Sequence, residues 1–378
     1  MAMAASDLRR PESCAPYVCG GPVCKTDCTT DADCTEQLCD LRGQVHECAA
    51  VVVAVDCATK PTALQAAING CTSACYFRVS GTCDKFTVQA RDVYVAGAAG
   101  AAIRPTSLDV SAVTVLEAGT SETTRLALTN LAIKGAKGTP GIGIEAGGSG
   151  GGNPEVFCAR CTIGGPGAES NDGAGISATN ATVTVTGGTV QNNSGAGISA
   201  TNATVTVTGG TVQNNSGAGI SATQTGFTVE NSILARNGLV SGRPGMAVLS
   251  DTAGLPKVFR HNTVAGNGHG GMSCSGSEAI TTIYASLFWN PGAWPEVDGC
   301  VADATSDIPN RQDACGNGEA TEPGFVELQP PDSNFHLLPT SLCIDKIACL
   351  PEVTTDIDGE SRPNGPSLCD VGADEVYP

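Results

Sequence analysis

Apolar and polar residues alternate along short stretches in the middle of the chain, and each stretch ends at glycine or asparagine. Residues 181–186, ATVTVT, alternate with period two, which predicts a β-strand with one buried face. Gly187-Gly188 ends this strand, and 189–191 form a second short strand. The Asn-Asn-Ser-Gly of 192–195 tolerates a left-handed backbone, and 197–201 form a third strand. Three short strands and three turns therefore fit in a unit of 22 residues.

The unit occurs twice in succession. Residues 195–216 repeat residues 173–194 letter for letter. A parallel β-helix accepts such a copy, because each coil contacts only its two neighbours. The added coil lengthens the rod by one strand spacing, about 4.8 Å. We therefore predict an all-β chain that folds as a parallel β-helix.

The period continues outside the two copies. Ile176, Ile198 and Ile220 recur at spacing 22, and Met246 and Met272 continue the series at spacing 26. We expect these five side chains to stack as one row of the core. Asparagines at the corners are expected to hydrogen-bond to their counterparts one coil away, which satisfies polar groups that a buried turn would leave unpaired.

Composition and charge restrict the partners. Hydrophobic residues make up 41% of the chain but aromatic residues only 4%, so small β-branched side chains must form the core. The 38 acidic and 20 basic residues give a net charge of −18, which repels phosphate backbones and anionic lipid. No run approaches the roughly 18 apolar residues of a membrane span. We expect a monomer with no nucleic-acid partner and no transmembrane segment.

Cysteine content points to an oxidising compartment. The chain has 19 cysteines, and they are densest between Cys14 and Cys57. Zinc is the alternative, because closely spaced thiolates also bind metal, but this segment lacks paired C-x2-C motifs and has only His46 nearby. We predict disulfides and a secreted or cell-surface location. The start, MAMAASDLRRPESC, lacks the apolar stretch of a secretory signal, which we expect to lie outside the given sequence.

Several segments resemble a known superfamily. The repeats are similar to those of right-handed parallel β-helix proteins of the pectate-lyase-like superfamily, and TALQAAINGC at 62–71 resembles the helix that caps the first coil there. LLPTSLCIDK and TDIDGESRP…CDVGADEV resemble a closing segment of bacterial surface β-helix proteins, and the Cys-rich start resembles disulfide-knotted segments of exported bacterial proteins. The resemblance implies a single-stranded right-handed parallel β-helix with an N-terminal capping helix; it does not imply one activity, because the fold hosts many.

These observations predict three parts. Residues 1–48 are a Cys-rich, disulfide-knotted N-terminal segment. Residues 49–335 form the β-helix, with three strands per coil of about 22 residues, a cap helix near 62–70 and the clearest repeats at 173–238. Residues 336–378 form a C-terminal cap segment.

Catalytic candidates come from two resemblances. NGHGGMS at 267–273 resembles an element of β-helix polygalacturonases, which implies a role for His269, with Asp251 as the carboxylate one coil back. A β-elimination lyase needs a basic residue near Ca²⁺ held by carboxylates, for which Arg243 and Arg260 are the candidates. The alternatives are a coil corner for His269 and solvated surface for the charged residues.

Two further groups could bind ligands. Asp356 and Asp358, with Asp370 or Glu375, offer oxygen ligands for Ca²⁺, the one cofactor that the sequence suggests; the alternative is a packed cap in which Arg362 pairs with a carboxylate and closes the edge of the last coil.

A row of threonines is the second group. Thr162, Thr184, Thr206 and Thr228 recur at spacing 22 and would form a ladder on the solvent face. Such a ladder resembles the ice-binding faces of some β-solenoids, whereas the strand propensity of threonine is the simpler explanation.

The predicted function is an exported, non-catalytic extracellular or cell-surface scaffold or adhesin, with a glycan or cell-surface molecule as its ligand. The alternative is a carbohydrate-active enzyme, either a polysaccharide lyase or a glycoside hydrolase. An ice-binding protein is the third hypothesis. An enzyme would need carboxylates and cations gathered on one face over several coils, and the sequence shows no such cluster.

Overall fold

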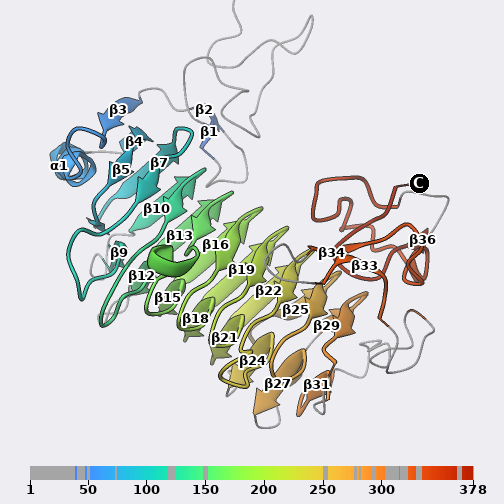
Figure 1. The fold of residues 1–378 in the computed structure, drawn as a ribbon. Coiled ribbons are helices and arrows are strands. Elements are labelled where there is room, and N and C mark those ends of the chain that lie inside the picture. Colours follow the sequence, from blue (N-terminus) through green and yellow to red (C-terminus); the bar gives the residue numbers. More distant parts are fainter. Residues whose placement is uncertain are drawn as a thin grey trace, which may run out of the picture.

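The computed structural model is a right-handed parallel β-helix, as predicted (Figure 1). It describes residues 52–72, 75–117, 124–147, 152–249, 254–275, 282–291, 295–302, 315, 322–328, 334–363 and 368–377, with short strands at 39–40, 47–48 and 279–280. Most of the predicted Cys-rich segment 1–48 and the candidate Asp251 lie outside the described residues. No described helix is long and apolar enough to cross a membrane.

Three parallel sheets run along the rod. Sheet 1 consists of β3 (Val53–Asp56), β4 (Cys75–Ser80), β7 (Asp92–Gly97), β10 (Arg125–Thr129), β13 (Glu155–Ala159), β16 (Thr182–Thr186), β19 (Thr204–Thr208), β22 (Gly226–Glu230), β25 (Lys257–Arg260) and β29 (Thr282–Tyr284). Sheet 2 consists of β5 (Thr82–Cys83), β8 (Ala102–Ile103), β11 (Ala132–Ile133), β14 (Thr162–Ile163), β17 (Thr189–Gln191), β20 (Thr211–Gln213), β23 (Ile233–Ala235), β26 (Thr263–Ala265) and β30 (Leu287–Trp289). Sheet 3 consists of β6 (Phe86–Gln89), β9 (Val113–Leu116), β12 (Ile144–Gly147), β15 (Ile176–Thr179), β18 (Ile198–Thr201), β21 (Ile220–Thr223), β24 (Met246–Leu249), β27 (Met272–Ser275) and β31 (Val297–Asp298).

The remaining elements are short. They are the helix α1 (Ala63–Gly70), a 3₁₀ turn at Gly167–Glu169, and the strands β1 (Cys39–Asp40), β2 (Glu47–Cys48), β28 (Ala279–Ile280), β32 (Val301–Ala302), β33 (Phe325–Glu327), β34 (Asn334–Leu337), β35 (Ile347–Ala348) and β36 (Leu368–Cys369).

Register between coils follows the repeat. Each residue of one copy pairs with its identical counterpart in the next, as Ile176 pairs with Ile198 and Ile198 with Ile220. Met246 and Met272 continue the same row, so the predicted core row is confirmed. Its five side chains are at most 1% exposed, which shows that alternate strand residues fill the rod interior.

A ladder of buried asparagines joins the corners between sheets 2 and 3, as the sequence predicts. The Asn171 side-chain amide donates to Asn193 Oδ1 (2.9 Å), and Asn193 in turn donates to Asn215 Oδ1 (2.8 Å). The same bond continues from Asn215 to Asn237 (2.9 Å), and the ladder extends further through Asn267 to Asn290. Because each amide both donates and accepts, the ladder satisfies buried polar groups in every coil that it crosses.

The helix α1 closes the N-terminal end of the rod, which confirms the predicted cap. Leu64 and Ile68 are buried in the main core. Gln65 accepts a hydrogen bond from the backbone N–H of Thr87 in β6 (2.6 Å) and donates one to its carbonyl (3.3 Å). Since β6 is the edge strand of sheet 3, this side chain occupies backbone groups that would otherwise be open to another strand.

Disulfides cross-link the described parts of the chain, as predicted. They join Cys57 to Cys83, Cys71 to Cys75, Cys158 to Cys161, Cys274 to Cys300, Cys315 to Cys343 and Cys349 to Cys369. Several bridges in one chain suggest an extracellular environment.

Residues 322–377, which we call the C-terminal unit, pack on the outer face of sheet 2 (Figure 1). In the copies this face carries Thr211 and Gln213, but one coil later the same positions are Ile233 and Ala235, which are 4% and 0% exposed. Leu287 extends this apolar patch in the last coil. The outward residues are therefore apolar where the C-terminal unit covers them.

Arg362 organises the C-terminal unit. Its guanidinium pairs with Glu375 at 2.9 Å and donates to the carbonyl of Gly372, so the predicted pairing with a carboxylate is confirmed. The unit was expected to close the edge of the last coil, whereas its apolar core packs on the side of the rod. The expected start at residue 336 falls inside β34, and β33 pairs with β34, so the unit includes residues before 336.

Deleting residues 195–216 should leave a folded rod one coil shorter. Asn193 would then meet Asn237 in place of Asn215, and the core row would stay continuous. We expect a β-type circular dichroism spectrum and a cooperative thermal transition within several degrees of that of the parent. A matched control deletes 195–205, half a coil, which shifts every later strand out of register and should abolish cooperative unfolding. Loss of cooperativity in the full-coil deletion would refute the one-coil assignment.

His261 should make the stability of the protein fall in acid. This side chain is 0% exposed, and burial, aided by the charges of Arg362 and Arg260, lowers its pKa to about 3. The unfolded chain binds a proton near pH 6.5 and the folded chain does not, so the free energy of unfolding falls as the pH drops below 6.5. The loss should reach about 4 kcal/mol near pH 3.5.

The variant His261→Asn isolates this effect. Asn231 occupies the equivalent corner one coil earlier with a similar positive φ, 47° against 49°, so the substitution suits the backbone. Burial raises the pKa of Asp370 to about 6, which acts in the opposite direction: stability decreases as the pH rises from about 4 to 6. The free energy of unfolding of both proteins is measured in urea between pH 7 and 4. Asp370 is present in both, so its contribution cancels in the difference between them. An unchanged difference in unfolding free energy across this range would contradict the assignment to His261.

Candidate functional site

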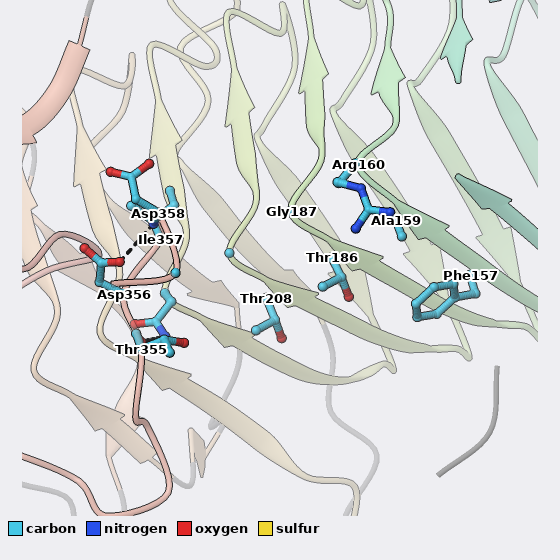
Figure 2. Close-up of a pocket in the computed structure, with 13 residues that line it drawn as sticks. Phe157, Ala159, Arg160, Thr186, Gly187, Thr208, Thr355, Asp356, Ile357 and Asp358 are labelled. Carbon is cyan, nitrogen blue, oxygen red and sulfur yellow. Dashed lines mark hydrogen bonds between the residues drawn. The ribbon is translucent and has the colours of Figure 1, made fainter. Parts of the chain in front are cut away.

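A pocket of about 570 Å³ lies on the side of the rod, where the copies meet the C-terminal unit (Figure 2). Its floor comes from the ends of β13, β16 and β19, and one wall is the loop 355–359. The lining residues are Phe157, Ala159, Arg160, Thr186, Gly187, Thr208, Gly209, Asn231, Thr355, Asp356, Ile357, Asp358 and Gly359.

Two glycines create the hollow. From β10 onward, the residue that follows each sheet 1 strand has a positive φ, and in the coils beside the copies it carries a side chain: Asn130, Arg160 and Asn231. In the two copies it is Gly187 and Gly209, with φ of 58° and 60°. Since residues with side chains adopt this conformation in the adjacent coils, the glycines are not required by the backbone alone. Their effect is to leave open space between Arg160 and the loop 355–359.

The far wall of the pocket presents an aromatic ring and a cation. Phe157 is partly buried and packs against a small cluster on the outer face of sheet 1, with Ala127 at its centre. Arg160 is held by hydrogen bonds from Nε to Asn130 Oδ1 (3.0 Å) and from Nη2 to Thr129 Oγ1 (3.3 Å). The guanidinium is therefore fixed in orientation at the edge of the pocket, as Figure 2 shows.

Polar groups line the floor and the near wall. The hydroxyls of Thr186 and Thr208 lie side by side in adjacent strands. Asn231 donates to the carbonyl of Thr355 (2.6 Å), while its Oδ1 is enclosed without a hydrogen-bond partner. Hydroxyl and amide groups beside an apolar ring are suited to a polar, uncharged ligand that can both donate and accept hydrogen bonds.

The two carboxylates of the loop 355–359, Asp356 and Asp358, differ in exposure and in hydrogen bonding. Asp356 is 4% exposed and accepts the backbone N–H groups of Asp358 (3.0 Å), Glu360 (2.8 Å) and Glu375 (3.1 Å). Asp358 is exposed and lies 3.1 Å from His336 Nε2. Desolvation, with repulsion from Asp356 and its neighbours, raises the pKa of Glu360. Asp356 therefore maintains the loop, whereas Asp358 remains available to a ligand.

The four calcium candidates do not form one ligand set in the structure. Asp370 accepts the backbone N–H groups of Asp345 and Val376, both at 2.8 Å. Glu375 accepts from Arg362 and from the N–H of Asp370. Asp356 is also engaged, so three of the four candidate residues accept hydrogen bonds with their carboxylate oxygens. These donors would compete with a cation for the same oxygens. The geometry favours the packed cap over the calcium hypothesis.

The catalytic candidates lie at two corners of the rod, with Arg243 and His269 at the corner between sheets 2 and 3 in successive coils. His269 lies in the turn between β26 and β27, and Arg243 is exposed in the loop between β23 and β24. Arg260 ends β25 in sheet 1, where it pairs with Glu230 and Glu352. None of these three residues lines the pocket described above. The structure thus separates Arg260 from the other two candidates, and the catalytic roles of all three stay untested.

The threonine ladder needs one correction. Thr184, Thr206 and Thr228 pair in order across β16, β19 and β22. Thr162 instead lies in sheet 2, where it pairs with Thr189, and Phe157 stands beside Thr184. The preceding coil is longer than 22 residues, so the constant spacing fails there. Spacing alone does not predict the pocket either, because in the sequence the Gly-Gly pairs of the copies indicate only the ends of strands.

Comparisons with known proteins support the architecture. Residues 115–288 match the family model described as the right handed beta helix region. No curated protein sequence matches the chain.

Among solved structures, the crystal structure of pectate lyase Pel9A is similar at 13% identity and a TM-score of 0.49, over 86% of this chain and 96% of that one. ORF18 of Geobacillus virus E2 is 13% identical with a TM-score of 0.41, over 66% and 60%. The A-module of the Azotobacter vinelandii mannuronan C-5 epimerase AlgE6 is 13% identical with a TM-score of 0.24, over 64% and 94%. Such distant likeness carries no argument about activity. The sheet register and the family model over residues 115–288 agree on the fold: the described coils form a right-handed parallel β-helix.

Proposed function

We propose that this chain is a non-catalytic extracellular or cell-surface scaffold or adhesin, and that its pocket binds a polar glycan. The observation that carries the proposal is the hollow above Gly187 and Gly209, bounded by Phe157 and Arg160 on one side and by the loop 355–359 on the other. A pocket of this size falls within the usual range for small-molecule sites, about 300–1,000 Å³.

The chemistry of the lining supports a sugar as the ligand. A pyranose offers hydroxyls for the threonine and asparagine groups and an apolar ring face for Phe157. The pocket carries charges of both signs, from Arg160 and Asp358, and the chain as a whole has a net charge of −18. Repulsion at longer range then disfavours highly acidic chains such as polyuronates.

The duplication argues against chemistry at this position. A coil inserted into a catalytic groove displaces every group beyond it by about 4.8 Å, and a misplacement of about 1 Å can already cost a hundredfold in rate. A binding surface instead gains length from the insertion. The disulfides support an extracellular setting for such a binder.

Filling the pocket should abolish glycan binding. The double variant Gly187→Asn and Gly209→Asn puts asparagine at both corners. Asn130 and Asn231 occupy the equivalent corners of other coils, so the fold should persist. We expect a glycan array to identify neutral oligosaccharide ligands, and calorimetry to show at least a tenfold loss of affinity in the double variant. Gly242→Asn is the matched control, because φ there is 63° and no neighbouring atom lies near an added Cβ.

Two results would contradict the proposal. One is equal glycan binding by the parent and the filled pocket. The other is turnover of pectate, polygalacturonate or alginate, with or without Ca²⁺, that disappears in His269→Ala or Arg243→Ala. That second result would favour the alternative of a polysaccharide lyase or glycoside hydrolase.

A further inference from the structure

Three side chains from separate segments converge beside the pocket. His336 belongs to β34, Asp358 to the loop 355–359, and Asp374 to the segment that follows β36. One ligand atom from each lies within 4.8 Å of the others. No spacing in the sequence groups these three residues, because the docking of separate segments of the C-terminal unit brings them together.

The imidazole of His336 is oriented by Asn334. The Asn334 Oδ1 atom accepts the backbone N–H of His336 (3.0 Å) and also contacts ring Nδ1. A carbonyl oxygen at this position assigns the proton to Nδ1 and leaves a lone pair on Nε2. Nε2 is enclosed, forms no hydrogen bond, and lies 3.1 Å from Asp358 Oδ2. Two lone pairs at this distance repel each other, so the contact requires either a proton on Nε2 or a metal cation between the two atoms.

The two carboxylates complement this nitrogen. Asp374 is 7% exposed, and its Oδ2 accepts the backbone N–H of Leu337 (2.7 Å), which fixes the side chain. The Asp358 side chain is 57% exposed and can rotate. Ligands bound at about 2.1 Å around a tetrahedral ion are about 3.4 Å apart. The three ligand atoms already lie within 4.8 Å of one another, and the exposed Asp358 side chain is the one that can rotate to adjust these separations.

We propose that His336, Asp358 and Asp374 bind one divalent transition-metal ion of the Zn²⁺ class. One imidazole nitrogen with two carboxylate oxygens suits Zn²⁺ better than Ca²⁺, which takes six to eight oxygen ligands. Asn334 supplies the outer hydrogen bond that metal-bound histidines usually have. Since Asp358 also lines the pocket, a fourth coordination position is available to a ligand hydroxyl. This last role depends on the proposed glycan function, whereas metal binding does not.

Calorimetry on the full chain, after treatment with a chelator, tests the site. Zn²⁺, Mn²⁺ and Ca²⁺ are titrated separately, and mass spectrometry counts the bound metal. We expect one Zn²⁺ per chain, bound more tightly than Ca²⁺, and a rise in the thermal midpoint. Asp358→Asn, an exposed position, should lower Zn²⁺ affinity at least tenfold, and Asn334→Ala should lower it about tenfold through the histidine.

Glu360→Gln is the matched control, since it removes a nearby exposed charge without removing a ligand. Equal weakening by Glu360→Gln and Asp358→Asn would reduce the effect to general acidic attraction and overturn the site. Absence of saturable Zn²⁺ binding would also overturn it and leave an imidazolium–carboxylate pair. Glycan binding is then measured with and without Zn²⁺. Saturable Zn²⁺ binding in a chain that binds no glycan would support the metal site and reject the proposed function.

Discussion

In-register stacking of one coil on the next is the constraint on which this structure depends. The backbone hydrogen bonds between coils and the rows of inward side chains both require that equivalent residues meet, as Ile176, Ile198 and Ile220 do. Extra residues can enter a coil only at a corner. The coil that begins at β13 has such an insertion between Ile163 and Ile176, where a 3₁₀ turn occupies Gly167–Glu169. The three sheets on either side are undisturbed, because the corner absorbs the difference in length.

The corners therefore carry the variation that a solenoid can use. From β10 onward, a left-handed residue follows each sheet 1 strand, and Asn, Arg, His, Ala and Gly all occupy this position in the chain. The choice among them has little effect on the rod, but it decides what the surface presents. Arg160 places a cation there, Asn231 an amide, and the glycines of the copies an open hollow. The binding surface thus arises at positions where the fold specifies backbone conformation and leaves the side chain free.

The sequence was sufficient for features set by local pattern. Strand alternation, the core row, the asparagine ladder and the cap helix follow from periodicity or resemblance, and each depends only on adjacent coils. The docking of the C-terminal unit joins residues far apart in the chain, such as Ala373 and Thr263. A repeat pattern in the sequence therefore does not predict it. A signal existed in the change from Thr211 and Gln213 to Ile233 and Ala235, since apolar residues on an outward face imply a cover. The pocket and the His336 group could not be predicted without that docking.

The position of the two copies along the rod determines how far apart the two walls of the pocket lie. Arg160 belongs to the coil before them, and the C-terminal unit docks on coils after them, beginning at Ile233. The copies therefore lie between the two walls of the pocket, and three strand spacings, about 14 Å, separate the corner of Arg160 from that of Asn231. Each copy changes this separation by about 4.8 Å without altering the contacts within either wall. The number of coils thus sets the length of the binding surface. A duplication without sequence change can alter which ligands the surface accommodates, while the core, the asparagine ladder and the docked C-terminal unit keep their own interactions.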